Sequence, residues 1–185
     1  MSCTKMTFAG SALFVAALTA PASTQSTPPM SAPAANPSGA PSSVVPTGLG
    51  EAIDRNVTRL RTATERLKVP SVAIAAGYAP ETNCVQHQPH GAMGIHFNNM
   101  ALRDATLDVE KPEVLVYEKR PDGTLQLNGV EFLVPFTAWT KTEPPTIMGQ
   151  PLKRADSLGF WYLHVWSESG NPSGLFADWN PNVKC

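Results

Sequence analysis

The sequence predicts an α+β fold, with N-terminal helices followed by a mainly antiparallel β-sheet in a single domain closed by a disulfide. Apolar residues recur every three or four positions between Leu49 and Leu67, which is the period of an amphipathic helix. Later in the chain, short apolar runs are bounded by turn residues, a pattern typical of strands. Because the helices precede the strands instead of alternating with them, the order favours α+β over α/β.

Composition and charge exclude two classes of protein. The 185 residues include 14 Lys+Arg and 15 Asp+Glu, giving a formal net charge of -1. This chain has no basic excess to neutralise phosphates, so we expect no nucleic-acid partner. No long apolar run follows the N-terminal one, so we expect no membrane span after cleavage of the N-terminal segment.

The first segment has the pattern of a secretory signal peptide. Lys5 precedes the short apolar stretch Phe8–Leu18, and the small residues of Ala20-Pro21-Ala22 follow it. A positive start, an apolar core and a small-residue site are typical of such peptides. We therefore predict a signal peptide over 1–22 and a secreted or periplasmic protein; an uncleaved anchor is the alternative.

A tether and one folded domain follow. Residues 23–47 are rich in Ser, Pro, Ala and Thr and carry no charge. Such a stretch buries too little apolar area to offset the entropy lost on ordering, so we predict a disordered tether. The remaining residues, 48–185, have the length of a single domain.

The folded part begins with the amphipathic helix that ends before Pro70. Proline suits the first turn of a helix, so a second, short helix is expected from Pro70 to Ala76. Gly77 is expected to end this second helix.

Four strands are predicted after the helices. Met93, Ile95 and Phe97 alternate with smaller or polar residues, which indicates a strand with one buried face. The runs Glu113–Glu118 and Gly129–Val134 flank a Pro-Asp-Gly turn and predict an antiparallel hairpin. Phe160–Ser167 is apolar on both faces, so it is expected to be a central, covered strand. The segment 135–158 is interrupted by prolines and is expected to be irregular.

Two cysteines remain once the signal peptide, with Cys3, is removed. An even pair in an exported protein predicts a disulfide, here between Cys84 and Cys185. It would tie the C-terminal residue to the middle of the chain.

The folded part also resembles a known family. The segments GAMGIHFNN, LDVEKPEVLVYE, NGVEFLVP, LHVW and NPSGLFADWNPNVKC occur in this order. Together they resemble a family of small exported bacterial proteins with no established activity, and the likeness covers about 60–185. The matching positions are Gly94, His96, Glu113, Tyr117, Glu118, Glu131, His164, Trp166, Asn171, Pro172, Gly174, Asp178, Trp179, Asn180, Pro181 and Cys185.

Polar residues inside apolar strands are the candidates for a metal site. His96 and His164 lie within strands, and Glu131 interrupts the apolar run VEFLV. If the strands of the two histidines are neighbours, these residues form a two-histidine, one-carboxylate set, which suits zinc or non-haem iron. The predicted cofactor is zinc or copper, with His87, His90 and Asp178 as possible additional ligands. The alternative is that each histidine only forms hydrogen bonds within the core.

Two further functions stay open. Tyr162, Trp166, Trp179 and Asn180 have the mixture of aromatic and amide groups that lines a binding groove. They favour a metal-free envelope or extracellular binding module, unless they serve only as core and turn residues. A hydrolase-like enzyme with a histidine general base is the third hypothesis. The sequence leaves the substrate and any catalytic residues undetermined.

Overall fold

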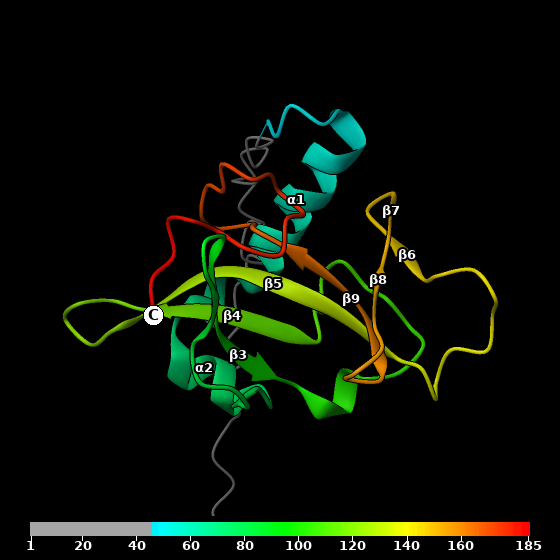
Figure 1. Ribbon diagram of the computed structural model, residues 1–185, viewed down its shortest axis with the longest axis horizontal. Coiled ribbons are helices and arrows are strands. Elements are labelled where there is room, and N and C mark those ends of the chain that lie inside the picture. The colour runs from blue at the N-terminus through cyan, green and yellow to red at the C-terminus, as the bar shows by residue number, and fades with distance from the viewer. Residues whose placement is uncertain (1–45) are drawn as a thin grey trace, which may run out of the picture. The chain divides into compact units, whose positions relative to one another are not determined.

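The computed structural model describes residues 46–185. The predicted signal peptide (1–22) and nearly all of the predicted tether (23–47) lie outside the described residues. The helical elements are α1 (Glu51–Thr64), the 3-10 turn η1 (Glu65–Lys68), α2 (Pro70–Ala75) and the 3-10 turn η2 (Met100–Leu102). The strands are β1 (Ala79–Pro80), β2 (Val85–His87), β3 (Gly91–Asn98), β4 (Val114–Lys119), β5 (Leu125–Pro135), β6 (Thr146–Ile147), β7 (Gln150–Pro151), β8 (Lys153–Ala155) and β9 (Phe160–Val165) (Figure 1).

The predicted antiparallel sheet is confirmed. Seven strands form it in the order β1-β3-β4-β5-β9-β8, and β2 also pairs with β3; every pairing is antiparallel. The predicted hairpin is β4–β5, with β5 beginning at Leu125, nearer to the turn than expected. Strand β9 lies between β5 and β8, so it is paired along both edges as predicted.

Two sequence predictions differ from the structure. The segment 135–158 is not wholly irregular, because it contains the β6–β7 hairpin and strand β8. Strands of two or three residues are too short to show a period in the sequence. The first helix stops at Thr64 and tightens into a 3-10 turn, because the residue before Pro70 must be extended; Val69 has φ -92° and ψ 110°.

The main core lies between α1 and one face of the sheet. Val57 and Leu60 on α1 are almost fully buried, as the helical spacing requires. They pack with sheet residues that alternate along β4, β5 and β9: Leu115, Tyr117, Val130, Phe132, Leu163 and Val165. Alternation along a strand sends the intervening residues to the opposite face.

That opposite face carries polar side chains. Glu131 is paired with Val114 on one side and with His164 on the other, so the three share this face. His96 is paired with Val116, which is two residues from Val114 and lies on the same face. The two histidines and the glutamate therefore project from one side of the sheet.

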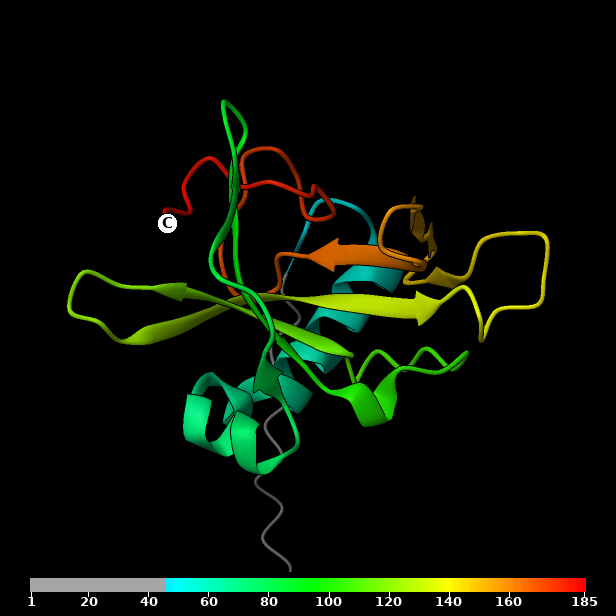
Figure 2. The ribbon, with the colours of Figure 1, turned by 60° about the horizontal axis from the view of Figure 1, so that its bottom comes forward.

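Strand β3 bends at Gly94. Residues 95–98 pair with β4, whereas residues 91–94 pair with β2. Gly94 has a φ of +122°, and a Cβ at this position would lie 2.5 Å from the carbonyl oxygen of Tyr117. The β2–β3 hairpin therefore rises away from the sheet (Figure 2). No helix within 46–185 is long and apolar enough to cross a membrane.

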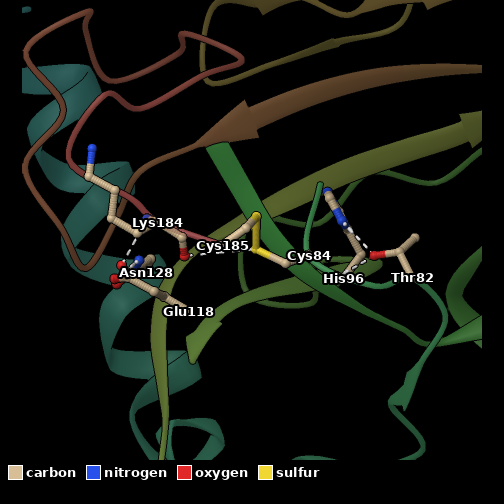
Figure 3. The surroundings of a disulfide bond; sticks show 7 residues. All are labelled: Thr82, Cys84, His96, Glu118, Asn128, Lys184 and Cys185. Carbon is tan, nitrogen blue, oxygen red and sulfur yellow. Dashed lines mark hydrogen bonds between the residues drawn. A yellow bond between two sulfur atoms is a disulfide. The ribbon is translucent and has the colours of Figure 1, made fainter. Parts of the chain in front are cut away.

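The C-terminal segment closes against this hairpin. Asn180 and Ala92 exchange two backbone hydrogen bonds, of 3.0 and 3.1 Å. Glu118 accepts a bond from the backbone N–H of Lys184 and a second from the side chain of Asn128 (Figure 3). The predicted disulfide joins Cys84 to Cys185, with Cα atoms 5.5 Å apart. The bond thus fixes the end of the chain to the start of β2.

Removing the disulfide is expected to destabilise the domain. The two cysteines are 101 residues apart, so the bond restricts a large part of the unfolded chain. A double Cys84→Ser, Cys185→Ser variant should lose about 2–5 kcal/mol of the free energy of unfolding. Urea denaturation measures this loss, and reduced wild type should unfold at the same urea concentration as the variant. An unchanged unfolding midpoint in the variant would contradict the assigned role.

Candidate metal centre

The structure brings His96, Glu131 and His164 into one buried cluster. One ligand atom from each residue lies within 4.8 Å of the others. The three side chains come from β3, β5 and β9, respectively. The sequence prediction required β3 and β9 to be neighbouring strands. They are not neighbours, because β4 and β5 lie between them. The two rings still approach to 6.3 Å between centroids, and both project from the same face of the sheet.

His96 is held by Thr82. The Thr82 hydroxyl oxygen accepts the backbone N–H of His96 and also lies 3.1 Å from the Nδ1 atom of its ring (Figure 3). The other nitrogen, Nε2, lies 3.9 Å from the Oε2 atom of Glu131. An Nδ1–H that donates to Thr82 leaves Nε2 with a free lone pair, which is the tautomer a metal ligand needs.

His164 is fully buried, and among residues 46–185 its ring nitrogens have no hydrogen-bond partner. Its ring stacks on Trp166 at 4.6 Å between centroids. Neither Nδ1 nor Nε2 has a hydrogen-bond partner in the part of the chain that the structure describes. Buried polar groups nearly always have such a partner, because burying one without it costs free energy. His164 is therefore the residue of this cluster that a purely structural role explains least well.

Burial sets the charge of the cluster. It lowers the pKa of His96 to about 4. It also lowers the pKa of His164 to about 3, with smaller contributions from His96 and Lys153. Burial and, to a smaller extent, the nearby Asp178 raise the pKa of Glu131, whereas Arg103 lowers it, and the resulting value is about 7. Near neutral pH both imidazoles are neutral and can donate lone pairs to a cation.

A cavity opens in front of the cluster. Its volume is about 560 Å³, within the range of about 300–1,000 Å³ usual for small-molecule sites. His96 and Glu131 lie in its wall, whereas His164 does not. The other lining residues are Glu81, Thr82, Val85, Met93, Asn98, Arg103, Leu133, Ala155, Leu158, Phe160, Tyr162 and Trp179.

The three additional predicted ligands lie outside the cluster. Asp178 forms an ion pair with Lys153, at 2.5 Å between Oδ1 and Nζ. The rings of His87 and His90 stack on each other at 5.3 Å, and His87 also contacts Trp179 at the same centroid distance. None of the three belongs to the group that can hold a metal ion in the described range.

Only half of the predicted aromatic groove lines the cavity. Tyr162 and Trp179 are in its wall. Trp166 is buried beneath His164, and its Nε1–H donates to the carbonyl of Ala177. Asn180 is fully buried, and its side chain bonds backbone groups of the C-terminal segment. Trp166 and Asn180 therefore support the fold instead of lining a groove.

Sequence reasoning missed four polar residues of the cavity, Glu81, Thr82, Asn98 and Arg103. Asn98 is two positions after His96, and the alternation of side chains along a strand places both on the same face of β3. The sequence pattern could therefore have predicted Asn98 as a neighbour of His96. Thr82 and Arg103 come from segments outside the strands. No periodic pattern connects such residues to a distant strand.

The cluster has the donor types of a metal site, in a wider arrangement. Tetrahedral zinc with bonds near 2 Å places its donors about 3.3–3.5 Å apart. In this structure the three ligand atoms are separated by up to 4.8 Å. The side chains must therefore move by about an ångström before all three atoms coordinate one ion. The cavity borders His96 and Glu131, so water or a ligand could reach an ion held by this group.

Comparisons with known proteins identify no relative. No protein-family model, curated protein or solved structure matches this chain. The resemblance to a family of exported bacterial proteins therefore stays a prediction, and the site must be interpreted from its own geometry.

The lowered pKa values predict that neither buried histidine titrates near neutral pH. Both lie below the 6.5 of an ordinary histidine. At mildly acidic pH the unfolded chain therefore binds more protons than the folded chain. The folded state loses stability as the pH falls below about 6.5. NMR of the imidazole groups in metal-free protein should show His96 and His164 unchanged between about pH 5 and pH 8. A titration midpoint for either ring in this interval would contradict the buried, neutral assignment.

Proposed function

We propose that this is an exported protein that binds one zinc or copper ion through His96, Glu131 and His164. The observation that carries the proposal is the fully buried His164 ring, close to His96 and Glu131, whose two nitrogens have no hydrogen-bond partner among the residues that the structure describes. Coordination would satisfy one of these nitrogens. The disulfide supports a location outside the reducing cytosol.

The donor set supports zinc or copper more than magnesium or calcium. Imidazole nitrogen suits zinc and copper, whereas magnesium and calcium prefer oxygen ligands. Two histidines and a glutamate, with an open position, are typical of catalytic zinc sites. A cation would also stabilise the ionised form of Glu131, whose burial otherwise favours the protonated form.

The open side of the site favours a role that involves a second ligand. A structural zinc site is normally closed by four protein ligands. Here two of the three proposed ligands, His96 and Glu131, lie in the wall of a cavity that is also lined by Tyr162 and Trp179. We propose that the bound ion presents its free positions to a small molecule in this cavity, either to bind it or to polarise it.

A metal-free binding module is the second candidate. The observation that favours it is the largely apolar wall of the cavity, with Leu133, Phe160, Tyr162 and Trp179. A histidine general base receives less support, because a pKa of about 4 for His96 makes that ring a weak base at neutral pH.

Elemental analysis of the exported, untagged protein tests the metal site. We expect about one zinc or copper ion per chain. The near-isosteric Glu131→Gln variant and the His164→Ala variant should both lose most of the metal, because each removes a ligand. Glu131→Gln keeps the test valid if His164→Ala does not fold.

The matched control replaces the two exposed histidines. A double His87→Ala, His90→Ala variant removes as many imidazoles as the cluster contains, yet it should keep its metal. Metal that is lost from this variant but retained by Glu131→Gln would place the ion at the loop and contradict the proposal. Wild-type protein without metal, and without stabilisation by added zinc or copper, would favour the metal-free module.

A further inference from the structure

One positively charged side chain lies in the wall of the cavity. Among the lining residues, Arg103 alone carries a permanent positive charge. It lies close enough to Glu131 to lower the pKa of that carboxyl group. Lys153, the other cation that acts on Glu131, is paired with Asp178 and does not line the cavity. Arg103 is therefore the group available to a ligand that occupies this space.

Among the described residues, only part of the hydrogen-bonding capacity of the Arg103 guanidinium is used. Its Nη2 atom donates to Oε2 of Glu81 at 2.8 Å and to the side-chain oxygen of Asn98. The Nε atom is buried and has no hydrogen-bond partner within residues 46–185. Glu81 is half exposed, so its pairing with Arg103 is open to competition from a ligand.

The rest of the wall is mainly apolar. Leu133, Phe160, Tyr162 and Trp179 line the cavity along with smaller apolar side chains. Such a surface favours an aliphatic or aromatic body, and the few polar groups fix its orientation. The cavity thus combines one guanidinium, an apolar wall and the proposed metal centre.

We propose that the ligand of this cavity is an amphipathic monocarboxylate, bound by Arg103 through its acid group and by the apolar wall through its body. A guanidinium binds carboxylates through charge-assisted hydrogen bonds, and the Nε–H of Arg103 is one donor without a partner in the described part of the chain. The inference deepens the proposed function, because it names the class of molecule that the metal would meet.

The charge balance favours a carboxylate over a phosphate. Glu81 already offsets part of the positive charge of Arg103. A phosphate monoester carries close to two negative charges at neutral pH. One partly neutralised guanidinium matches a single negative charge better than two.

Calorimetric titration with matched ligands tests this inference. The probes are phenylacetate, 3-phenylpropionate, hexanoate and octanoate, with the primary amide of each and with phenyl phosphate. At least one acid should bind zinc-loaded wild type about tenfold or more tightly than its amide, because an added charged hydrogen bond contributes this much. The preference for the acid should disappear in Arg103→Gln.

The control variant is Arg59→Gln. Arg59 is an exposed arginine of α1 that pairs with Glu110 and does not line the cavity. This variant should keep the preference for the acid. The inference is overturned if every acid binds no better than its amide, if Arg103→Gln keeps the preference, or if phenyl phosphate binds more tightly than all four acids.

Zinc content, measured on the same samples, separates this inference from the metal proposal. Arg103→Gln should retain its zinc, because Arg103 is not a ligand. Acid binding that depends on Arg103 in a protein that takes up no metal would support the ligand class and contradict the metal centre. Normal zinc content without any acid preference would contradict the ligand class alone.

Discussion

At Gly94, strand β3 leaves its partner β4 and carries the β2–β3 hairpin away from the sheet. Residues 95–98, which follow Gly94, stay paired with β4 and hold the His96 ring on the face of the sheet that also carries Glu131 and His164, and the site depends on this placement. Three contacts hold the bent hairpin in place. They are the backbone bridge between Ala92 and Asn180, the disulfide, and the two hydrogen bonds between Thr82 and His96. The C-terminal segment and the sheet thus position the cluster together.

The cost of burying the cluster explains why a cation fits it. Two imidazoles and a carboxyl group are buried on one face of the sheet. Burial lowers the pKa of both imidazoles and raises the pKa of the carboxyl group, so that the neutral form of each is favoured. The His96 ring has one hydrogen-bond partner, Thr82, while the His164 ring has none in the described range. A metal ion would accept lone pairs from both rings and stabilise the ionised carboxylate. Selection for stability alone would favour an apolar residue at the position of His164.

Local patterns in the sequence predicted the sheet, the disulfide and the members of the cluster. Alternation revealed that His96, Glu131 and His164 interrupt apolar strands, and such residues need a partner. The approach of the histidines was predicted on the condition that their strands are neighbours, and this condition was wrong, because β4 and β5 lie between β3 and β9. Thr82 and Arg103 lie in connecting segments without periodicity, so only the folded chain assigns them to the cavity. Trp166 and Asn180 show the converse, since residue types suited to binding are used here in the interior.

A crystal structure of the exported protein loaded with zinc, with anomalous scattering recorded at the zinc edge, tests the central claim most directly. The account predicts one strong anomalous peak at bonding distance, about 2.0–2.2 Å, from a ring nitrogen of His96, a ring nitrogen of His164 and a carboxylate oxygen of Glu131. The peak should border the cavity. A peak only beside His87 and His90, or no peak among the three buried residues at full zinc loading, would contradict it.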